Sequence, residues 1–375
     1  MAERDIILDG RKSSRIVLAD DLAAATSLAG GGRRLFLLYD EAVAKTAGTL
    51  ISTGKFLSHK ALRTSEQLKC LATVEEICTW LLREGADRNS FLIAMGGGIT
   101  TDMAGFAASV YKRGIDFGFI PTTLLGQVDA AIGGKNGVNF LSLKNMLGVI
   151  RQPAFTLIST RALQGLPWKT FASGAAEMLK TFIIDDTDGN YAKATGLLAK
   201  MKDAAAIGPD AFDKALRDND EELSELIFAA ACIKAGIVER DPFEKGERRL
   251  LNLGHTFAHA IESIGISRQK EASPANAPAT TLSHGESVAI GIILAARLSE
   301  ALGIAPDGLA DMLKADFEKC GLPTVSPYPI EEMAPAMAKD KKADGSLVHF
   351  VLPSKIGNTV IHDLTPAEAA GKLTA

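Results

Sequence analysis

The chain has 375 residues, of which 47% are hydrophobic, and carries a formal net charge of -4 at pH 7. Single hydrophobic cores stop growing at roughly 250 to 300 residues, so the length predicts two domains. The slight negative charge supplies no overall basic field, which argues against nucleic acid or an anionic membrane surface as a partner.

The N-terminus, MAERDIILDG, carries charges where a secretory signal would need an apolar run. No segment approaches the roughly 18 uninterrupted apolar residues of a membrane span. The four cysteines, Cys70, Cys78, Cys232 and Cys320, contain no CxxC pair and fit reduced thiols in a large core. We therefore expect a cytoplasmic protein with no membrane segment.

Short apolar runs alternate with helical patterns in the first part of the chain. The runs lie at residues 16–18, 35–39, 91–95 and 117–120, and residues 74–82 form a further apolar segment among them. Strands that alternate with helices indicate a parallel sheet. We therefore predict an open α/β domain over residues 1–160.

Helical patterns dominate the rest of the chain, at residues 221–239, 250–264 and 287–302. Strand signals return only at residues 348–352 and 359–361. These patterns predict a mainly helical second domain over residues 161–375. The Ala-, Pro- and Ser-rich segment at residues 267–281 lacks apolar periodicity and is expected to be a mobile surface loop.

A glycine-rich turn joins the apolar run at residues 91–95 to the helical pattern that contains Asp102. The turn is Gly96, Gly97 and Gly98. Glycines at a strand-to-helix turn let the backbone approach a pyrophosphate, and the helix N-terminus supplies free N–H groups. The spacing is not GxGxxG, so a nucleotide site and a plain tight connection both remain open.

Two lysines and an asparagine follow in a second glycine-rich region. Lys135 lies in GGKNG at residues 133–137, and Lys144 and Asn145 come shortly after. Ammonium and amide groups beside glycine backbone can hold phosphate or carboxylate oxygens. The alternative is a solvated loop without a ligand.

Glu177 and Lys180 are separated by about one helical turn and would face the same way. Surface ion pairs explain most such spacings. The neighbouring residues are apolar, however, which favours a buried pair.

The segment RRLLNLGHTFAHAIE at residues 248–262 is the strongest local signal. As one helix it would place Arg248, Asn252, His255 and His259 on a single polar stripe. His284 follows in LSHGE, and two histidines with a carboxylate such as Glu177 would make a three-ligand metal site with open positions. The segment lacks the glutamate of HExxH and is therefore not a zincin motif. The other histidines, His59, His349 and His362, are expected to be ordinary surface or strand residues.

Taken together, the motifs resemble those of 3-dehydroquinate synthases from about residue 39 to residue 342. The resemblance rests on the ordered occurrence of GGGxxxDxxGF, PTTLLxQVDxxxGGKxGVN, LKN, GxAExxK, RxLLNLGHTFxHAIE, HGExVAxG and DKK. It implies a Rossmann-like N-terminal domain with a parallel sheet, followed by an all-helical C-terminal domain.

The resemblance also implies a set of site residues. A divalent metal, zinc or cobalt, would be held by Glu177, His255 and His284. NAD would be bound by Asp40, Glu66, Lys69, Gly97, Gly98, Asp102, Thr122, Thr123 and Lys144. The substrate would be handled by Asp129, Lys135, Asn145, Lys180, Lys234, Arg248, Asn252, His259 and Lys341, with Arg113 reaching across from the second subunit of a homodimer.

The reaction implied is conversion of 3-deoxy-D-arabino-heptulosonate 7-phosphate to 3-dehydroquinate and phosphate, in the shikimate pathway of aromatic amino acid biosynthesis, with NAD used catalytically. Alternatives are a cyclase that makes inosose or valiolone rings, a metal-dependent polyol dehydrogenase, and a cofactor-binding protein without catalysis. The complete metal triad argues against the last of these. The chain departs from the commonest family pattern at Ser65, Thr101, Asn136 and Gly165.

Overall fold

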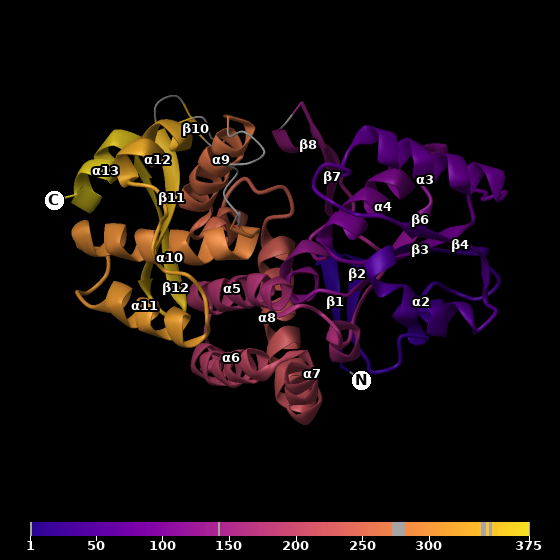
Figure 1. Ribbon diagram of the computed structural model, residues 1–375. Helices are drawn as coiled ribbons and strands as arrows, with labels where there is room; N and C mark the ends of the chain where they lie inside the picture. The colour runs from indigo at the N-terminus through magenta and orange to yellow at the C-terminus, as the bar shows by residue number, and fades with distance from the viewer. Residues whose placement is uncertain (1, 142, 272–281, 339–342, 345–346, 375) are drawn as a thin grey trace. The chain divides into compact units, whose positions relative to one another are not determined.

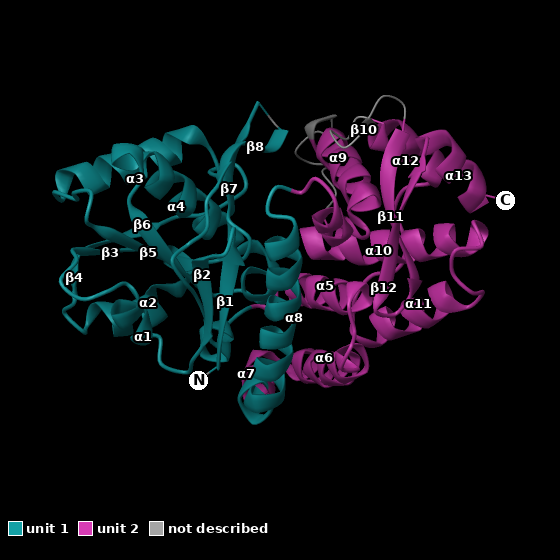
Figure 2. Ribbon diagram, turned by 180° about the vertical axis from the view of Figure 1, so that it is seen from behind, with its two compact units in different colours: residues 1–166, 216–243 teal, residues 167–215, 244–375 magenta. Residues whose placement is uncertain are grey.

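The computed structural model describes residues 2–141, 143–271, 282–338, 343–344 and 347–374. The chain forms two compact units (Figures 1 and 2): residues 1–166 with 216–243, and residues 167–215 with 244–375. Within the described residues, every helix is too short or too polar to cross a membrane.

Unit 1 is built on a seven-stranded sheet in the order β1-β2-β9-β6-β5-β3-β4. Its strands are β1 (Ala2–Leu8), β2 (Arg11–Leu18), β3 (Leu35–Asp40), β4 (Phe56–Leu62), β5 (Phe91–Gly96), β6 (Asp116–Pro121) and β9 (Thr156–Ile158). All neighbouring pairs are parallel except β1 and β2. The predicted α/β domain with a parallel sheet is therefore confirmed.

Helices cover both faces of this sheet. The first core contains Val74 and Ile77 of α3 (Leu71–Arg83) and Met103 and Ala104 of α4 (Gly98–Val110), packed against strand residues such as Phe36. The opposite core is lined by α1 (Ala24–Leu28) and α2 (Ala44–Ile51) (Figure 2). The helical segments of unit 1 are α1 (Ala24–Leu28), η1 (Glu41–Val43), α2 (Ala44–Ile51), α3 (Leu71–Arg83), α4 (Gly98–Val110), η2 (Tyr111–Arg113), η3 (Gly126–Ala130), η4 (Thr160–Leu163) and α8 (Asp220–Arg240).

A hairpin of β7 (Lys135–Phe140) and β8 (Leu143–Ile150) forms where the sequence indicates a glycine-rich loop. Lys135 begins the first strand, and Lys144 and Asn145 lie in the second. The candidate anion-binding residues of this region therefore share one two-stranded element.

Unit 2 is mainly helical. Its helices are α5 (Trp168–Ile184), α6 (Asn190–Ile207), η5 (Glu247–Asn252), α9 (His255–Glu271), α10 (His284–Ala301), α11 (Leu309–Lys319), α12 (Ile330–Met337) and α13 (Pro366–Thr374). The unit also holds most of α7 (Pro209–Asp218). The strands expected near the end of the chain form an antiparallel sheet of β10 (Ala343–Asp344), β11 (Leu347–Lys355) and β12 (Asn358–Leu364), so the domain is not entirely helical.

Residues 248–264 do not form the single helix that their periodicity predicts. The segment η5 ends at Asn252, and α9 begins at His255. Gly254 between them has φ +78°, and a Cβ atom there would lie 2.8 Å from Ile292 Cγ1 of α10. The break lets the backbone approach α10, and Arg248 and Asn252 therefore do not continue the helical stripe of His255.

The surface loop expected at residues 267–281 is not found over the first part of that segment. Helix α9 continues to Glu271, so the first five residues of that segment are helical. The remaining residues, 272–281, lie outside the described residues.

Candidate metal centre and cofactor site

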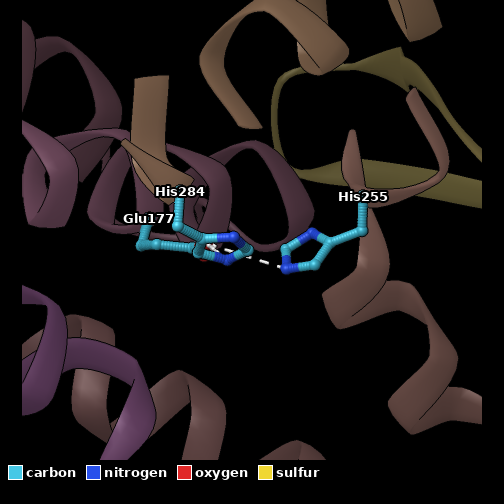
Figure 3. Close-up of side chains that lie close together, drawn as sticks. All are labelled: Glu177, His255 and His284. Atoms are coloured by element: carbon cyan, nitrogen blue, oxygen red, sulfur yellow. Dashed lines mark ion pairs between the residues drawn. The ribbon is translucent and has the colours of Figure 1, made fainter. Parts of the chain in front are cut away.

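Three side chains of unit 2 converge on one point (Figure 3). Glu177 lies in the middle of α5, and His255 and His284 are the first residues of α9 and α10. Glu177 Oε1 is 3.4 Å from His284 Nε2 and 3.7 Å from His255 Nε2. One ligand atom from each residue lies within 4.8 Å of the other two, so the structure brings together the three residues proposed as metal ligands.

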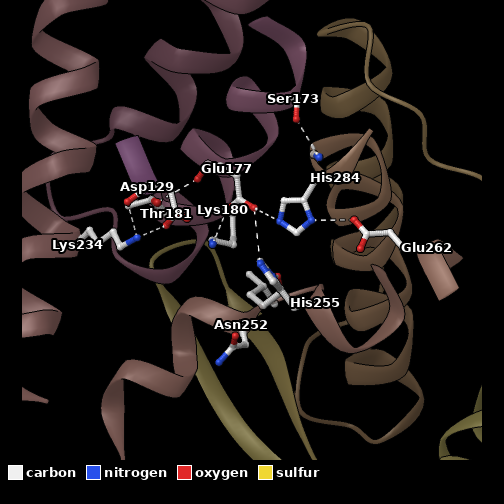
Figure 4. A network of polar contacts seen from close by, with 12 residues as sticks. Asp129, Ser173, Glu177, Lys180, Thr181, Lys234, Asn252, His255, Glu262 and His284 are labelled. Carbon is white, nitrogen blue, oxygen red and sulfur yellow. Dashed lines mark hydrogen bonds and ion pairs between the residues drawn. The ribbon is translucent and has the colours of Figure 1, made fainter. Parts of the chain in front are cut away.

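The outer nitrogen of each imidazole faces an acceptor, and Figure 4 shows the contact between His284 and Glu262. His284 Nδ1 lies 2.9 Å from Glu262 Oε1, and His255 Nδ1 lies 3.2 Å from the carbonyl oxygen of Leu253. Each Nδ1 can donate its proton outward, so that a neutral ring would present the lone pair of Nε2 toward Glu177, and a cation would take the place of a proton on that nitrogen. Two oriented imidazoles and one carboxylate are the donor set of a three-ligand metal site, so these residues fit a divalent cation.

The electrostatics of the triad favour bound positive charge. Glu177 is fully buried, and neither of its carboxylate oxygens has a hydrogen bond in good geometry among the described residues. Burial alone would raise the pKa of Glu177, but the Lys180 ammonium, with which it forms an ion pair, and His284 lower the pKa to about 2. Burial alone would lower the pKa of His284, but the carboxylates of Glu177 and Glu262 raise it to about 9. The buried carboxylate is thus charged at neutral pH and is balanced by cationic neighbours.

The pair of Glu177 and Lys180 is not a surface ion pair. The two side chains are 0% and 1% exposed, because α5 is buried along most of its length. The alternative of a solvated pair is therefore wrong, and the apolar neighbours in the sequence were the correct signal.

Glu262 contacts the centre through His284 but is not among the residues predicted from the sequence. It lies two turns after His255 on α9, at the spacing i, i+7, on the same side of the helix as His259. Extending the polar stripe by one more turn would have identified it.

The other predicted substrate residues of unit 2 that the structure describes lie in η5 and α9. Arg248 is 2% exposed in η5, and Asn252 Nδ2 donates to Glu244 Oε1 at 2.8 Å. The His259 ring centroid is 5.6 Å from that of His255. Lys341 lies outside the described residues.

The candidate cofactor residues of unit 1 gather at the carboxyl edge of the sheet. After β3 the chain goes outward to β4 and returns as β5 on the other side of β3, which makes a topological switch point. Asp40 ends β3, Gly97 immediately precedes α4, and Thr122 follows β6. Ligands of open α/β sheets bind in the crevice at such a switch point, and the free N–H groups of α4 suit a pyrophosphate.

An ion pair between the buried Lys69 and the half-buried Asp102 joins this edge to the hairpin. Lys69 Nζ donates to Asp102 Oδ2 at 2.5 Å and to Asn145 Oδ1 at 2.6 Å. Burial raises the pKa of Asp102 to about 6 although the Lys69 ammonium opposes the shift. Two predicted NAD residues and one predicted substrate residue therefore form one cluster.

The remaining NAD candidates also lie in unit 1. The carbonyl oxygen of Glu66 accepts a hydrogen bond from Asn139 Nδ2 at 3.1 Å, and Thr123 Oγ1 accepts one from the Gly126 N–H at 3.0 Å. Gly98 begins α4, where a Cβ atom would lie 3.0 Å from Ala130 Cβ. Lys144 is exposed on β8.

The departures from the family pattern make local backbone contacts. Thr101 Oγ1 donates to the Gly98 carbonyl at 3.0 Å, and Ser65 Oγ accepts from the Leu68 N–H at 3.2 Å. Asn136 Nδ2 donates to the carbonyls of Gly134 and Arg151 at 2.8 and 2.9 Å. Gly165 has φ +78°.

The remaining substrate candidates of unit 1 fall into one paired and two exposed groups. Lys234 Nζ of α8 donates two hydrogen bonds to Asp129 (Figure 4). One goes to Oδ1 at 2.6 Å and the other to the backbone carbonyl oxygen at 2.7 Å. Lys135 and Arg113 are exposed, at the start of β7 and in η2 respectively.

We expect replacement of Gly97 with valine to weaken NAD binding about tenfold or more. A Cβ atom at this position would lie 3.2 Å from Thr123 Cγ2, and the larger side chain would occupy the space over the start of α4 that a pyrophosphate needs. Titration with NAD followed by calorimetry measures the effect. Gly48→Val is the matched control, because Gly48 lies in α2 of the same unit with no atom within 4 Å of its Cβ position. Equal affinities in the two variants would place the cofactor elsewhere.

Known proteins are similar to this chain in both sequence and structure. Family models described as the N-terminal and C-terminal parts of 3-dehydroquinate synthase match residues 59–173 and 174–343. A 3-dehydroquinate synthase of Acidithiobacillus ferrooxidans is 37% identical over 360 residues, which cover 94% of this chain and 91% of that protein.

Two solved structures share the fold over nearly the whole chain. The 2-epi-5-epi-valiolone synthase of Streptomyces hygroscopicus subsp. jinggangensis, with NAD+ and Zn2+ bound, has a TM-score of 0.80 at 27% identity and covers 97% of this chain, with 96% of its own length matched. A 2-deoxy-scyllo-inosose synthase in complex with carbaglucose-6-phosphate, NAD+ and Co2+ also has a TM-score of 0.80, at 20% identity, with 99% of each chain covered. At this lower identity the second likeness concerns the fold alone.

Proposed function

This chain belongs to the 3-dehydroquinate synthase family, and from that membership we propose that it converts 3-deoxy-D-arabino-heptulosonate 7-phosphate to 3-dehydroquinate and phosphate. The observation that carries the proposal is the centre of Glu177, His255 and His284, in which both Nε2 atoms face a fully buried carboxylate. Such a centre suits a substrate that presents neighbouring oxygens to a divalent cation.

NAD and a divalent cation, zinc or cobalt, are the cofactors of this proposal. When bound, the cation supplies a Lewis acid that acidifies a hydroxyl, and NAD accepts a hydride and later returns it. The residues that would hold the cation are Glu177, His255 and His284, with Glu262 orienting His284. The residues that would hold NAD lie at the carboxyl edge of the sheet of unit 1 and include Asp40, Gly97 and Asp102.

Buried cations occur in both units and suit a substrate that carries a phosphate and a carboxylate. In unit 2, Lys180 and Arg248 are buried, and in unit 1 Lys234 is buried beside Asp129. Lys180 already pairs with Glu177, and Lys234 pairs with Asp129. The cyclase is therefore favoured over a polyol dehydrogenase by the family match, and not by unmet charge in the site.

Two exposed cations, Lys135 and Arg113, are proposed to bind the phosphate. Arg113 lies in the turn after α4, and we assign it to the site of a second copy of the chain in a homodimer. His259, one turn after His255, is proposed to hold a proton for transfer to the departing phosphate or the substrate.

Release of inorganic phosphate tests the proposal. The purified chain, loaded with NAD and Zn2+ or Co2+, should release phosphate from 3-deoxy-D-arabino-heptulosonate 7-phosphate, and a chelator should abolish the release. NADH should not accumulate, because the hydride is returned in each turnover. A seven-carbon ketose phosphate that lacks the carboxylate serves as the comparison substrate. Faster turnover of that compound, or stoichiometric formation of NADH, would overturn the assignment.

A further inference from the structure

The turn that carries Arg113 has an unusual backbone. Lys112, Arg113 and Gly114 have φ values of +49°, +67° and +116°. A run of positive φ angles in residues with side chains is strained and persists only where the surroundings hold it. The turn has two backbone hydrogen bonds, from the Gly114 N–H to the Tyr111 carbonyl at 2.8 Å and from the Ile115 N–H to the Ala108 carbonyl at 2.9 Å.

The side chain of Arg151 packs against this turn. A Cβ atom on Gly114 would lie 3.2 Å from Arg151 Nη1 and 3.6 Å from its Cζ. The guanidinium also donates to the Ala108 carbonyl at 3.4 Å, pairs with Asp116 Oδ1 at 3.3 Å, and lies 5.2 Å from the ring centroid of Phe117. Arg151 therefore contacts both the end of α4 and the start of β6, the strand that follows the turn. These contacts hold the end of the helix and the start of the strand together.

The backbone of Arg151 fixes a second loop, the one that precedes Lys135. The Arg151 N–H donates to the Gly134 carbonyl at 2.8 Å, and the Arg151 carbonyl accepts from Asn136 Nδ2 at 2.9 Å. Lys135, between Gly134 and Asn136, is paired with Ile150 in the hairpin. A Cβ atom on Gly134 would lie 2.9 Å from the Arg151 carbonyl carbon, so the two backbones are in close contact.

We propose that Arg151 is a positioning residue that sets the places of two phosphate-binding cations, Arg113 through its side chain and Lys135 through its backbone. The inference rests on the proposed function, because it takes the phosphate of the substrate as the common ligand of these cations. The guanidinium of Arg151 is engaged by Asp116, Phe117 and Ala108. It acts through the two loops and is not itself assigned a contact with substrate.

The chain offers a matched control in Arg33. Its guanidinium pairs with the other oxygen of the same carboxylate, Asp116 Oδ2, at 2.7 Å, and lies 5.2 Å from the ring centroid of Phe91. The two arginine side chains are 27% and 34% exposed. Arg33→Gln therefore removes an equivalent ion pair and ring contact but leaves both loops untouched.

Steady-state kinetics distinguish positioning from general stability. We expect Arg151→Gln to raise KM for the phosphorylated substrate about tenfold, since displacement of a binding group by a fraction of an ångström is costly, while KM for NAD and metal content stay unchanged. Arg33→Gln should change KM for the substrate less than twofold. Equal KM values in the two variants, or a fall in kcat alone, would overturn the inference.

Limited trypsin digestion tests the inference without any enzymatic activity. Lys112, Arg113 and Lys135 are themselves cleavage sites in the two loops. We expect Arg151→Gln to increase the cleavage rate at Lys112 and Arg113 about tenfold, because the variant loses the side-chain contacts that hold this turn. The rate at Lys135 should stay at the wild-type level, because glutamine keeps the backbone contacts with Gly134 and Asn136. Arg33→Gln should leave all three rates unchanged. A uniform increase at all sites, or no increase at Lys112 and Arg113, would overturn the inference. If the wild-type chain fails to release phosphate while this pattern is seen, the proposed function is wrong and the anchoring of the loops stands.

Discussion

Replacement of His255 with alanine should remove the bound divalent cation and lower turnover by at least about a thousandfold. A cation that acidifies a substrate hydroxyl contributes several kcal/mol to the transition state, and each 1.36 kcal/mol corresponds to a factor of ten. The variant leaves the fully buried Glu177 with only one of its two imidazole partners, His284. Elemental analysis after dialysis measures the metal directly, and phosphate release measures turnover.

His259→Ala is the control for this experiment. His259 lies one turn further along α9, with its ring centroid 5.6 Å from that of His255, but it does not belong to the three-residue ligand group. We expect this variant to keep its full metal content even if its turnover falls. A His255→Ala protein with unchanged metal content would remove His255 from the ligand set, and loss of metal from both variants would indicate a general collapse of α9.

The architecture of unit 1 was predictable because its central strands are buried on both faces. Residues of β5 (Phe91–Gly96) are all buried, and strands in that position read as continuous apolar runs. The run of glycines then marks the strand-to-helix turn without ambiguity. The hairpin was missed because most of β8 is exposed, so its sequence lacks the apolar pattern that identifies a strand.

The break before His255 was not predictable from local pattern. The apolar positions on both sides of Gly254 are compatible with one continuous helix. The chain breaks because Gly254 approaches α10 closely, with Val288 O and Ile292 N each 2.9 Å from its Cβ position. That contact joins residues more than thirty positions apart. The apolar pattern of residues 248–264 therefore cannot indicate where the helix is broken. The break also places His255 at the first position of α9, so that its Nδ1 faces the carbonyl of Leu253.

The metal centre could be assembled from the sequence only in part. The spacing of His255 and His259 predicts a shared helix face, but Glu177 and His284 come from other helices. The residue chemistry suggests two histidines with a carboxylate such as Glu177, and the family resemblance is what implies these three residues as the ligand set. The depth of burial of Glu177 and Lys180, and the contact of Glu262 with His284, depend on how α5, α9 and α10 pack.

Replacement of Arg113 with alanine should lower kcat/KM for the phosphorylated substrate by roughly ten- to a hundredfold. A charge-assisted contact between a guanidinium and a phosphate contributes about 1.5 to 3 kcal/mol, which corresponds to this range. Metal content and NAD affinity should stay at the wild-type level. Lys112→Ala is the matched control, because Lys112 is the adjacent residue, is also exposed, and has φ +49° where Arg113 has +67°.

Mixing two impaired variants tests whether Arg113 serves the site of a partner chain. An Arg113→Ala chain keeps its own Lys135, and a Lys135→Ala chain keeps its own Arg113. If the arginine acts across a symmetric interface, each heterodimer contains one complete site, because the Lys135→Ala chain donates Arg113 to its partner. Random exchange of equal amounts makes half of the dimers heterodimers, so activity should recover to about a quarter of the wild-type value. An arginine that serves its own chain leaves every site with one defect, and the mixture would then be no more active than the average of the two variants.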